Sequence, residues 1–453
     1  MDMAALHDQA DIIRTAFSYI NRFKGHTFVI RVEGSLLTHP FAGLLLKDIA
    51  LLQKMGIQIV LIPGARSRID EVLASEKISC EKINNIRITP EDAMPYVEMA
   101  SFDVSNRFMT LLAENNCDAI IGNFVKARRI GVLEGVDYQC SGMVEKINAS
   151  RVTSLLESGI IPIFPNIGWS RTGKPYNISS NELAFTLARD LQATKLFFIT
   201  DFGGISAKGY DIPEGVYVSS DTVISQLTAP QARQFLDRNR EKPGAPAYEL
   251  VTLAYRACQE GIDRVHIIDG RVEGMLIKEI FSNRGLGTMI YSDPHENLRT
   301  ASHQDIPDML RVMQPLVEEG FLLLRTGADV EKAIGDYILY EVDGTLHGCG
   351  ALHVFSDKSG EIAALAVDKT YTNFGIGKKI VVYLIEQAVK KGLKRVFLLT
   401  TQTADWFLQF GFAEVTVADL PPEKQKTYNT KRNSLILCYD LEIHRKKAGF
   451  GAE

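Results

Sequence analysis

Short apolar runs alternate with amphipathic stretches in the N-terminal part of this chain. The segments HTFVIRV, IQIVLIP, AIIGNFV, GIIPIFP, KLFFIT and RVHIID are apolar at consecutive positions, and turn residues end each of them. Strands that are apolar on both faces are typical of a parallel sheet covered by helices on both sides. The pattern therefore predicts one doubly wound α/β domain over residues 26–291.

The segments that flank this domain have other patterns. Before Gly25, Ile12, Ile13, Phe17 and Ile20 recur at helical spacing, which predicts an N-terminal helix over residues 1–25. After the last apolar run, the polar stretch YSDPHENLRTASHQD indicates a linker over residues 292–300.

The C-terminal part predicts a second, smaller α+β domain over residues 301–453. It begins with the helical segment IPDMLRVMQPLVEEG. The stretch YILYEVDGTLHGCGALHVFSDKSGEIAALAVD then alternates like a meander of strands, with expected turns at Asp343-Gly344 and Ser359-Gly360.

Composition and charge exclude several classes of function. Of the 453 residues, 46% are hydrophobic and 23% charged, as in globular domains. A net charge of -5 gives no general attraction to nucleic acid or to an anionic membrane. No apolar run approaches the roughly 18 residues that span a bilayer, and the acidic N-terminus does not resemble a signal peptide. We therefore expect neither a nucleic-acid nor a membrane partner.

The six cysteines are scattered, and no C-x-x-C pair occurs. This spacing suggests neither a zinc site nor a disulfide framework. We expect reduced cysteines, a cytoplasmic location and no metal.

Two glycines lie between an apolar strand and an amphipathic helix. The strand Ile362–Val367 is followed by Gly375 and Gly377, and then by a helical pattern that includes Ile380 and Leu384. Glycines at the start of a helix let backbone N–H groups approach a pyrophosphate, whose charge the helix dipole favours.

This loop is similar to the Q/R-x-x-G-x-G/A acetyl-CoA loop of GNAT-type N-acetyltransferases, with Thr372 where that family usually has Gln or Arg. The resemblance implies acetyl-CoA as co-substrate. It also implies that the co-substrate is bound by Leu365, Ala366, Val367, Gly375, Ile376 and Gly377.

Two further segments narrow the resemblance. KRVFLLTTQTADWFLQFGFAEV carries a W-F-x-x-x-G-F signature, and KTYNTKRNSLIL carries Y-N-x-x-R-x-S. Both are similar to bacterial N-acetylglutamate synthases, and the matches cover most of residues 300–445. The resemblance implies transfer of an acetyl group from acetyl-CoA to the α-amino group of L-glutamate, in arginine biosynthesis.

The same resemblance assigns catalytic roles. Attack on a thioester needs a neutral amine, whereas amino groups are largely protonated at neutral pH. Glu361 occupies the position of the family's general base, which takes this proton directly or through water. Thr400, where the family has serine, and Tyr428 are rival proton donors to the leaving CoA thiolate, and the sequence does not choose between them.

Substrate binding is assigned in the same way. Arginine guanidinium groups bind carboxylates through two parallel hydrogen bonds. Arg325 and Arg432 match the family's substrate-binding arginines, and Ser434 would add a hydroxyl contact. Which carboxylate of glutamate meets which arginine stays open.

The N-terminal domain resembles the amino-acid kinase family, especially N-acetylglutamate kinase, in HIIDGRVEGMLIKEIFSNRGLGTMIYSD and NISSNELAFTLARDLQATKLFFITDFGG. Phosphoryl transfer needs cations and a glycine-rich cradle around the phosphates. The expected kinase residues are replaced at Arg31, at Pro63-Gly64-Ala65-Arg66, at Asn181 and at Tyr248. We therefore expect a domain that does not phosphorylate.

Similarity to arginine-sensitive kinases and synthases implies an L-arginine site, inhibition by arginine and a homo-hexamer joined through the N-terminal helix. The implied site residues are Tyr19, Lys208, His266, Glu279, Gly285 and Gly287. Alternatively, these residues only hold the C-terminal strand and turn of the domain. Two other functions stay open: an acetylglutamate kinase, alone or bifunctional, and an arginine sensor with an inactive acetyltransferase domain.

Overall fold

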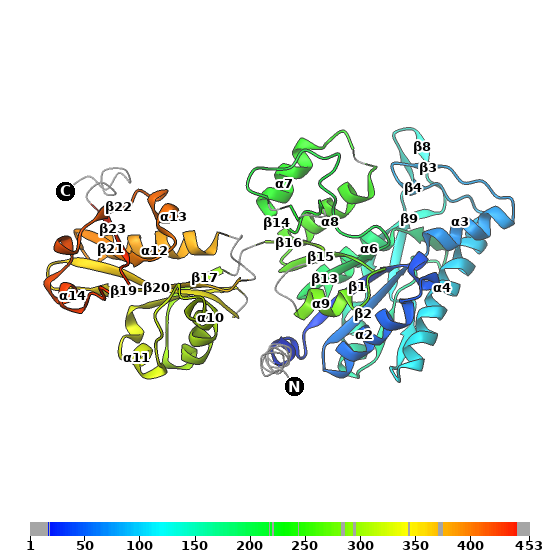
Figure 1. Cartoon of the computed structure of the whole chain (residues 1–453). Helices are drawn as coiled ribbons and strands as arrows, with labels where there is room; N and C mark the ends of the chain where they lie inside the picture. The colour runs from blue at the N-terminus through cyan, green and yellow to red at the C-terminus, as the bar shows by residue number, and fades with distance from the viewer. Residues whose placement is uncertain are drawn as a thin grey trace. The chain divides into compact units, whose positions relative to one another are not determined.

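The computed structural model of the chain forms two compact units, Met1–Asp293 and Pro294–Glu453 (Figure 1). The residues that it describes are 17, 19–216, 218–219, 222–242, 244–281, 286–292, 296–342, 345–369 and 375–441. Most of the predicted N-terminal helix, together with Gly285, Thr372 and the turn at Asp343-Gly344, lies outside these residues.

The first unit is built on a large sheet. Among the described residues, eight strands follow the order β14-β16-β15-β13-β1-β2-β10-β5. Neighbouring strands are parallel, except that β16 is antiparallel to β15. The strands are β1 (Thr27–Glu33), β2 (Gln58–Gly64), β5 (Ala119–Ile121), β10 (Ile161–Ile163), β13 (Lys195–Thr200), β14 (Gln226–Thr228), β15 (Arg264–Asp269) and β16 (Thr288–Tyr291).

Helices cover both faces of this sheet. Along β1, Val29 packs into one apolar cluster while Phe28 and Ile30 pack into another, because successive side chains point to opposite faces. One face carries α2 (Ala42–Lys54), α3 (Arg66–Ser75), α4 (Met94–Glu114) and α9 (Met275–Phe281). The other carries α5 (Ala149–Glu157), α6 (Ser180–Asp190), α7 (Ala229–Arg238) and α8 (Pro246–Gln259).

A small closed barrel lies beside the sheet and was not predicted. Its strands are β6 (Val125–Arg129), β9 (Ser141–Ile147), β11 (Ile167–Trp169) and β12 (Pro175–Ile178). The run AIIGNFV, which predicted one strand, breaks after Ile121 so that β5 joins the sheet and β6 joins the barrel. Two short hairpins, β3 (Lys82–Ile83) with β4 (Ile86–Arg87) and β7 (Val132–Leu133) with β8 (Val136–Asp137), complete the unit.

The second unit contains a sheet of the order β17-β18-β19-β20-β21-β23-β22 within its described part. Only β20 and β21 pair in parallel there; the other pairs are antiparallel. The strands are β17 (Glu296–Thr300), β18 (Tyr337–Val342), β19 (Thr345–Val354), β20 (Ser359–Val367), β21 (Arg395–Thr400), β22 (Ala413–Val415) and β23 (Leu435–Asp440). Strand β17 lies within the segment predicted as linker. Its sequence is mostly polar, and its pairing with β18 is a contact between distant segments.

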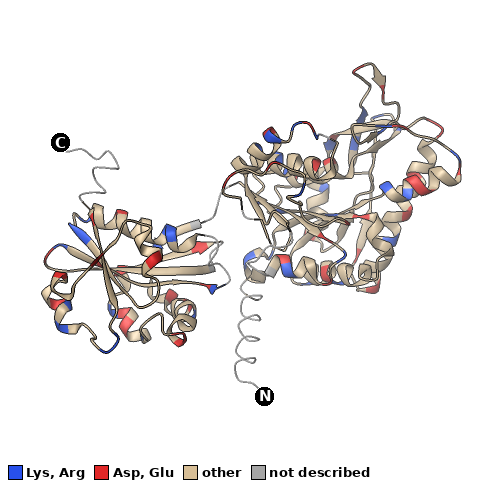
Figure 2. Ribbon diagram, turned by 45° about the horizontal axis from the view of Figure 1, so that its top comes forward, with Lys and Arg blue, Asp and Glu red and all other residues tan. Residues whose placement is uncertain are grey.

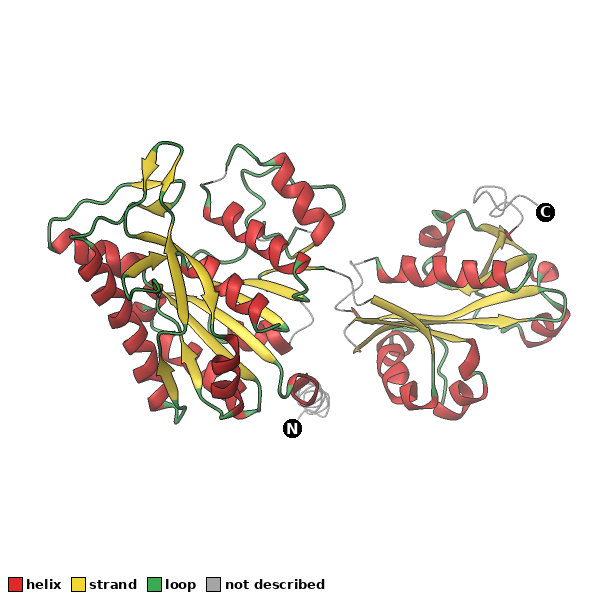
Figure 3. Ribbon diagram, turned by 180° about the vertical axis from the view of Figure 1, so that it is seen from behind, coloured by secondary structure: helices red, strands yellow, loops and turns green. Residues whose placement is uncertain are grey.

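Helices cover both faces of this sheet as well (Figure 3). The long helix α12 (Ile376–Lys390) packs on one face, and α10 (Ile306–Glu318) and α11 (Gly327–Lys332) pack on the other. Two short helices, α13 (Ala404–Leu408) and α14 (Pro422–Thr427), follow β21 and β22.

The turn between β19 and β20 precedes the predicted position. Ser359 and Gly360 begin β20, and Lys358 takes the left-handed conformation with φ 63°. A Cβ on Gly360 would lie 2.8 Å from Leu352 Cδ1 and 2.9 Å from Leu393 Cδ1. The glycine therefore permits close packing rather than a turn.

Basic and acidic residues are interspersed along the helices of both units (Figure 2). Among the described residues, no helix is long and apolar enough to cross a membrane. The same part of the chain holds no cluster of three His, Cys, Asp or Glu side chains suited to a metal ion.

Candidate active site and effector region

Strands β20 and β21 separate near the middle of the C-terminal unit. They pair only from Ser359 to Glu361, where Glu361 lies opposite Phe397. Beyond that point, the described residues of β20 pair only with β19, and those of β21 only with β23. Beyond Glu361 the two strands no longer pair with each other, and strand edges of this kind can pair with an extended, amide-containing ligand.

A β-bulge bends β20 just beyond Glu361. Cys349 pairs with Ala366 and Ala351 with Ala363, so one residue of β19 opposes two of β20. Ala364 accordingly has a φ of 51°. Bulges bend a strand and re-aim its side chains, and they often lie beside active sites. Leu365, Ala366 and Val367, the predicted acetyl-CoA contacts, follow directly.

Glu361 lies at the point where the two strands part, and its carboxylate is already paired. Lys424 on α14 places Nζ 2.7 Å from Oε1 and 2.7 Å from Oε2. Only 10% of the Glu361 side chain and 23% of the Lys424 side chain are exposed. The candidate base is therefore held by a cation that the sequence did not indicate.

The neighbours of Glu361 define one face of the sheet. His353 lies opposite Glu361 on β19, and its Nδ1 is 2.7 Å from Asp336 Oδ2. On the other side, Phe397 packs in the same apolar cluster as Tyr428. Glu361 and Tyr428 thus share the face that lies opposite α12.

Three hydroxyl groups are candidates for protonating a leaving thiolate: those of Thr400, Thr401 and Tyr428. Thr400 ends β21, and its Oγ1 is 2.8 Å from Thr403 Oγ1 and accepts the Thr403 N–H at 3.1 Å. Alternation along β21 places Thr400 with Leu398 on the α12 face, away from Glu361. The hydroxyl of Thr401 is buried without a hydrogen-bond partner among the described residues.

Tyr428 has a structural role in this state. Its hydroxyl donates to the Ser434 carbonyl at 2.9 Å and closes the loop between α14 and β23. Asn429 Oδ1 accepts the N–H groups of Lys431 and Arg432 inside that loop. Ser434 itself is buried.

The predicted substrate arginines lie on two segments that the fold joins. Arg432 Nη2 donates to the carbonyls of Gly320 at 3.0 Å and Phe321 at 2.9 Å, just after α10. Arg325 follows on the same segment, half-buried, with Nη1 donating to Leu323 O at 3.4 Å. Arg432 therefore ties its own loop to the segment that carries Arg325.

The N-terminus of α12 lies against an aromatic side chain. Gly375 precedes the helix in the left-handed conformation, with φ 70°, and no side chain caps the first turn. A Cβ on Gly377 would lie 3.4 Å from Cη2 of Trp406 and 3.7 Å from Val367 Cγ2. Uncapped N–H groups at a helix start can bind phosphate. Ile376 is buried in the core below them.

In the N-terminal unit, His266 and Glu279 form a buried pair. His266 Nδ1 is 2.8 Å from Glu279 Oε1, and the two side chains are 3% and 1% exposed. Burial lowers the pKa of His266. Burial alone would raise the pKa of Glu279, but the hydrogen bonds from His266 and from the N–H groups of Leu286 and Gly287 lower it. The pair is thus a neutral imidazole beside a carboxylate.

The remaining predicted effector residues lie partly together. Phe197 stacks on His266 with ring centroids 4.7 Å apart. Lys195 lies on the same strand as Phe197. Its Nζ donates to Tyr19 Oη at 2.5 Å and lies 5.0 Å from the centroid of the Tyr19 ring. A Cβ on Gly287 would collide with the Ile267 carbonyl oxygen. Lys208 lies in an exposed turn.

At the positions where kinase residues are replaced, the side chains contact other residues of the same unit. Arg31 is 7% exposed, and its Nη1 lies 2.6 Å from Glu33 Oε2. Asn181 Nδ2 donates to Glu249 Oε1 at 2.9 Å. Tyr248 is part of α8, and its hydroxyl donates to the Leu236 carbonyl at 3.4 Å.

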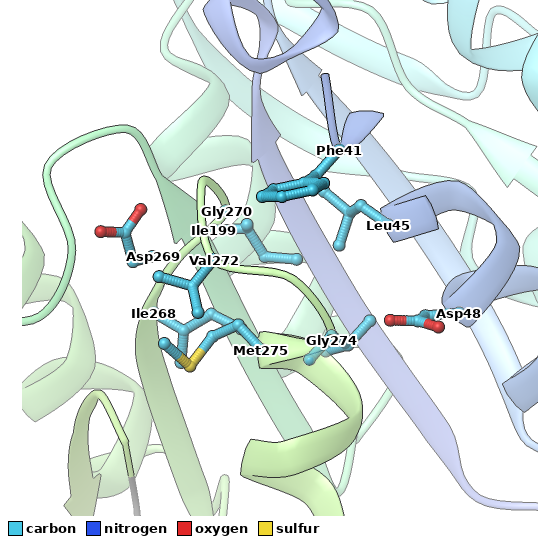
Figure 4. A pocket seen from close by; sticks show the side chains of 11 residues that line it. Phe41, Leu45, Asp48, Ile199, Ile268, Asp269, Gly270, Val272, Gly274 and Met275 are labelled. Atoms are coloured by element: carbon cyan, nitrogen blue, oxygen red, sulfur yellow. The ribbon is translucent and has the colours of Figure 1, made fainter. Parts of the chain in front are cut away.

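A small pocket lies between α2 and the loop before α9, and Figure 4 shows its lining. Phe41, Leu45 and Asp48 contribute from the α2 side, and Gly274 and Met275 from the other. Asp48 Oδ2 is buried without a hydrogen-bond partner in the described part of the chain. Burial raises the pKa of Asp48 to about 6.

Sequence reasoning missed Lys424, Thr401 and Lys195. Lys424 is 63 positions from Glu361, so no local spacing links the two residues. Lys195 and Tyr19 are 176 positions apart. Thr401 follows Thr400 directly, and the sequence gives no reason to prefer one over the other.

Comparison with known proteins agrees with this architecture. Residues 26–269 match the amino acid kinase family, and residues 310–412 match the acetyltransferase (GNAT) family. The amino-acid acetyltransferase of Pasteurella multocida is 32% identical, covering 95% of this chain and 97% of its own. That of Shewanella oneidensis is 34% identical, with the same two coverages, 95% and 97%.

Solved structures agree with these relatives. The N-acetylglutamate synthase of Neisseria gonorrhoeae, complexed with coenzyme A and L-arginine, is 30% identical with a TM-score of 0.77. The match covers 95% of this chain and 99% of the N. gonorrhoeae chain. The same enzyme complexed with coenzyme A and N-acetyl-glutamate is 32% identical with a TM-score of 0.59 over 95% and 99% of the two chains.

The fold and the site define an N-acetyltransferase in which an amino-acid kinase-like domain precedes a GNAT domain. The chain belongs to the bacterial amino-acid acetyltransferase (N-acetylglutamate synthase) family. The predicted fold class and enzyme class are therefore confirmed.

Proposed function

We propose that the protein transfers the acetyl group of acetyl-CoA to the α-amino group of L-glutamate, and that L-arginine bound to the N-terminal unit inhibits this reaction. The first part of this proposal, acetyl transfer to L-glutamate, rests on the position of Glu361. Its carboxylate lies where β20 and β21 part, beside the strand edge that follows it and on the face opposite α12. The names and ligands of the solved relatives support the choice of substrate and effector.

In the proposed reaction, both substrates are bound together. Glu361 accepts a proton from the α-ammonium group, directly or through water. The neutral nitrogen attacks the thioester carbonyl, and the carbon–sulfur bond breaks. The CoA thiolate then takes a proton from Thr400 or Tyr428, with Thr401 as a third candidate because its hydroxyl has no partner among the described residues. The acylated nitrogen gives its second proton to the hydroxyl oxygen that has lost one, and Glu361 releases its proton to water. The products are N-acetylglutamate and CoA, and no covalent enzyme intermediate is needed.

The two arginines and Ser434 are proposed to bind the carboxylates of glutamate. The support is the pair of hydrogen bonds that joins Arg432 to the carbonyls of Gly320 and Phe321, on the segment that also carries Arg325. Leu365, Ala366 and Val367 would pair with the amide arm of acetyl-CoA, and the first turn of α12 at Gly375, Ile376 and Gly377 would bind its phosphates.

The proposed arginine site rests on the hydrogen-bonding capacity of the buried pair. When His266 donates from Nδ1 to Glu279, its Nε2 is an acceptor, and this atom has no partner among the described residues. Glu279 also only accepts. A guanidinium group carries five donors and no acceptor, so it complements both side chains. Tyr19, Lys208, Gly285 and Gly287 complete the proposed site.

We also infer that the N-terminal unit does not phosphorylate, because its remaining cation at the first kinase position, Arg31, is buried and paired with Glu33. The domain limits 1–25, 26–291, 292–300 and 301–453, the hexamer and the cytoplasmic location remain predictions. Light scattering of the purified protein tests the assembly.

The test of the function follows thiol release from acetyl-CoA with L-glutamate, with other amino acids, and with added L-arginine. We expect release that depends on glutamate and falls with arginine, and an E279Q variant that keeps the activity but loses the response. Release with another amine would overturn the substrate. Unchanged release with saturating arginine would overturn the regulation.

A further inference from the structure

The ion pair between Lys424 and Glu361 is symmetric and mostly buried. The ammonium nitrogen lies 2.7 Å from each carboxylate oxygen, and most of both side chains is buried. Opposite charges at this distance, away from water, interact more strongly than an exposed pair. The contact therefore restricts the orientation of the Glu361 carboxylate.

The helix that carries Lys424 does not depend on this pair for its position. The neighbouring Glu423 accepts a hydrogen bond from Ser356 Oγ at 2.6 Å, at the turn between β19 and β20. Gln425 Nε2 donates to the carbonyls of Ala418 at 3.1 Å and Leu420 at 2.8 Å. Since α14 has these separate anchors, Lys424 adds to the structure chiefly at Glu361.

The other groups around Glu361 do not replace Lys424. From β19, His353 lies opposite but is held by the Asp336 carboxylate. From β21, the opposite residue is the uncharged Phe397. From α14, the nearest acidic group, Glu423, is bonded to Ser356. Among the described residues, Lys424 is thus the cation with a hydrogen bond to Glu361.

We infer that Lys424 is a positioning residue for the general base, an inference that rests on the proposed function. It holds the Glu361 carboxylate in one orientation before the substrate arrives. The α-ammonium group of the substrate then competes for one carboxylate oxygen, while Lys424 retains the other. The proton passes from the substrate nitrogen to the released oxygen, and Lys424 touches neither acetyl-CoA nor the reacting nitrogen.

The experiment compares K424M with K424R in the full-length protein, by thiol release from acetyl-CoA over a range of pH. General base catalysis contributes about 10²–10⁴-fold, so we expect K424M to lower kcat at neutral pH by about 10- to 100-fold. The KM for acetyl-CoA should stay near that of the unsubstituted protein. K424R should restore most of kcat.

Two variants on the same surface are matched controls. K426M removes an exposed lysine from the same helix, and S356A removes one of the two separate anchors of α14. Both should keep kcat within about twofold, as surface substitutions usually do. Circular dichroism and thermal melting check that each variant is folded.

The outcomes separate this inference from the proposed function. Parental kcat in K424M, or an equal loss of activity in S356A, would overturn the positioning role alone. If the unsubstituted protein releases thiol with an amine other than glutamate, the substrate is wrong and the same comparison is made with that amine. If it releases thiol with no amine, both proposals fail.

Discussion

The carboxyl group of Asp48 allows a stability prediction with a defined sign. Asp48 lines the pocket in Figure 4, and its Oδ2 is buried without a partner among the described residues. Burial raises its pKa from 3.8 to about 6, and the nearby Lys47 only partly offsets this effect. The ionised form, which dominates at neutral pH, is therefore the form that the fold disfavours.

The magnitude follows from the linkage between proton binding and folding. The folded pKa is raised, so the carboxyl group contributes stability below the unfolded value of 3.8, and this contribution is lost as the pH rises through about 6. The difference is about two pK units at about 1.4 kcal/mol each, or about 3 kcal/mol. Asp48 is partly exposed, and solvent screening reduces the expected cost at pH 7.5 to about 1–3 kcal/mol.

The substitution D48N removes the charge and keeps the shape. We expect the free energy of unfolding at pH 7.5 to rise by about 1–3 kcal/mol, and the difference from the parent to shrink as the pH falls toward 4. The chain has two tryptophans, Trp169 in the first unit and Trp406 in the second. Urea unfolding in a W406F background, followed by the fluorescence of Trp169, therefore reports the unit that contains Asp48.

Two results would refute this reasoning. If D48N is no more stable than the W406F parent at pH 7.5, Asp48 finds a partner or water in the folded state. If the difference between the two proteins is the same at pH 7.5 and pH 4, the gain does not come from the charge.

Three further predictions concern the two sites. E361Q should lower kcat for thiol release by about 10²–10⁴-fold, with a much smaller change in KM, because it removes the base. G377V should raise the KM for acetyl-CoA by about tenfold, or about 1.4 kcal/mol, because its side chain crowds Trp406 beside the first turn of α12. Y19F loses the hydrogen bond that holds Tyr19 to Lys195, worth about 1.5–3 kcal/mol. Because Tyr19 is part of the proposed arginine site, calorimetry should show weaker arginine binding.

Each of these predictions has a contrary result. Parental kcat in E361Q would remove Glu361 from the mechanism. Equal losses in the binding of glutamate and acetyl-CoA by G377V would indicate a damaged fold rather than a lost phosphate contact. Parental arginine affinity in Y19F would separate the N-terminal helix from the effector site.

The family relationship was readable from the sequence because its signals are local. The glycines at Gly375 and Gly377 lie where the structure starts α12. Runs such as KLFFIT predicted strands buried on both faces, and β13 is buried along its whole length. Burial and backbone conformation leave a repeated pattern in neighbouring residues, so these features need no knowledge of distant contacts.

Other features were predicted incompletely. The run AIIGNFV gave no sign that its two halves join different sheets, and the polar segment 296–300 gave no sign of β17. A short strand pairs with the sheet edge that the folded chain places beside it, so its own residues do not specify its partner. The predicted site residues also carried no information about their partners.

By itself, the sequence determined two α/β units and the succession of most strands and helices along the chain, and it predicted residues for the chemistry. Only the tertiary structure decided that Glu361 is held by Lys424, 63 positions away, and that Arg432 binds a carbonyl 112 positions away. It also paired His266 with Glu279 and left Nε2 of that histidine without a partner among the described residues. A buried charge or polar atom must be matched by whatever group the fold brings to it, and that match depends on the whole chain rather than on adjacent residues.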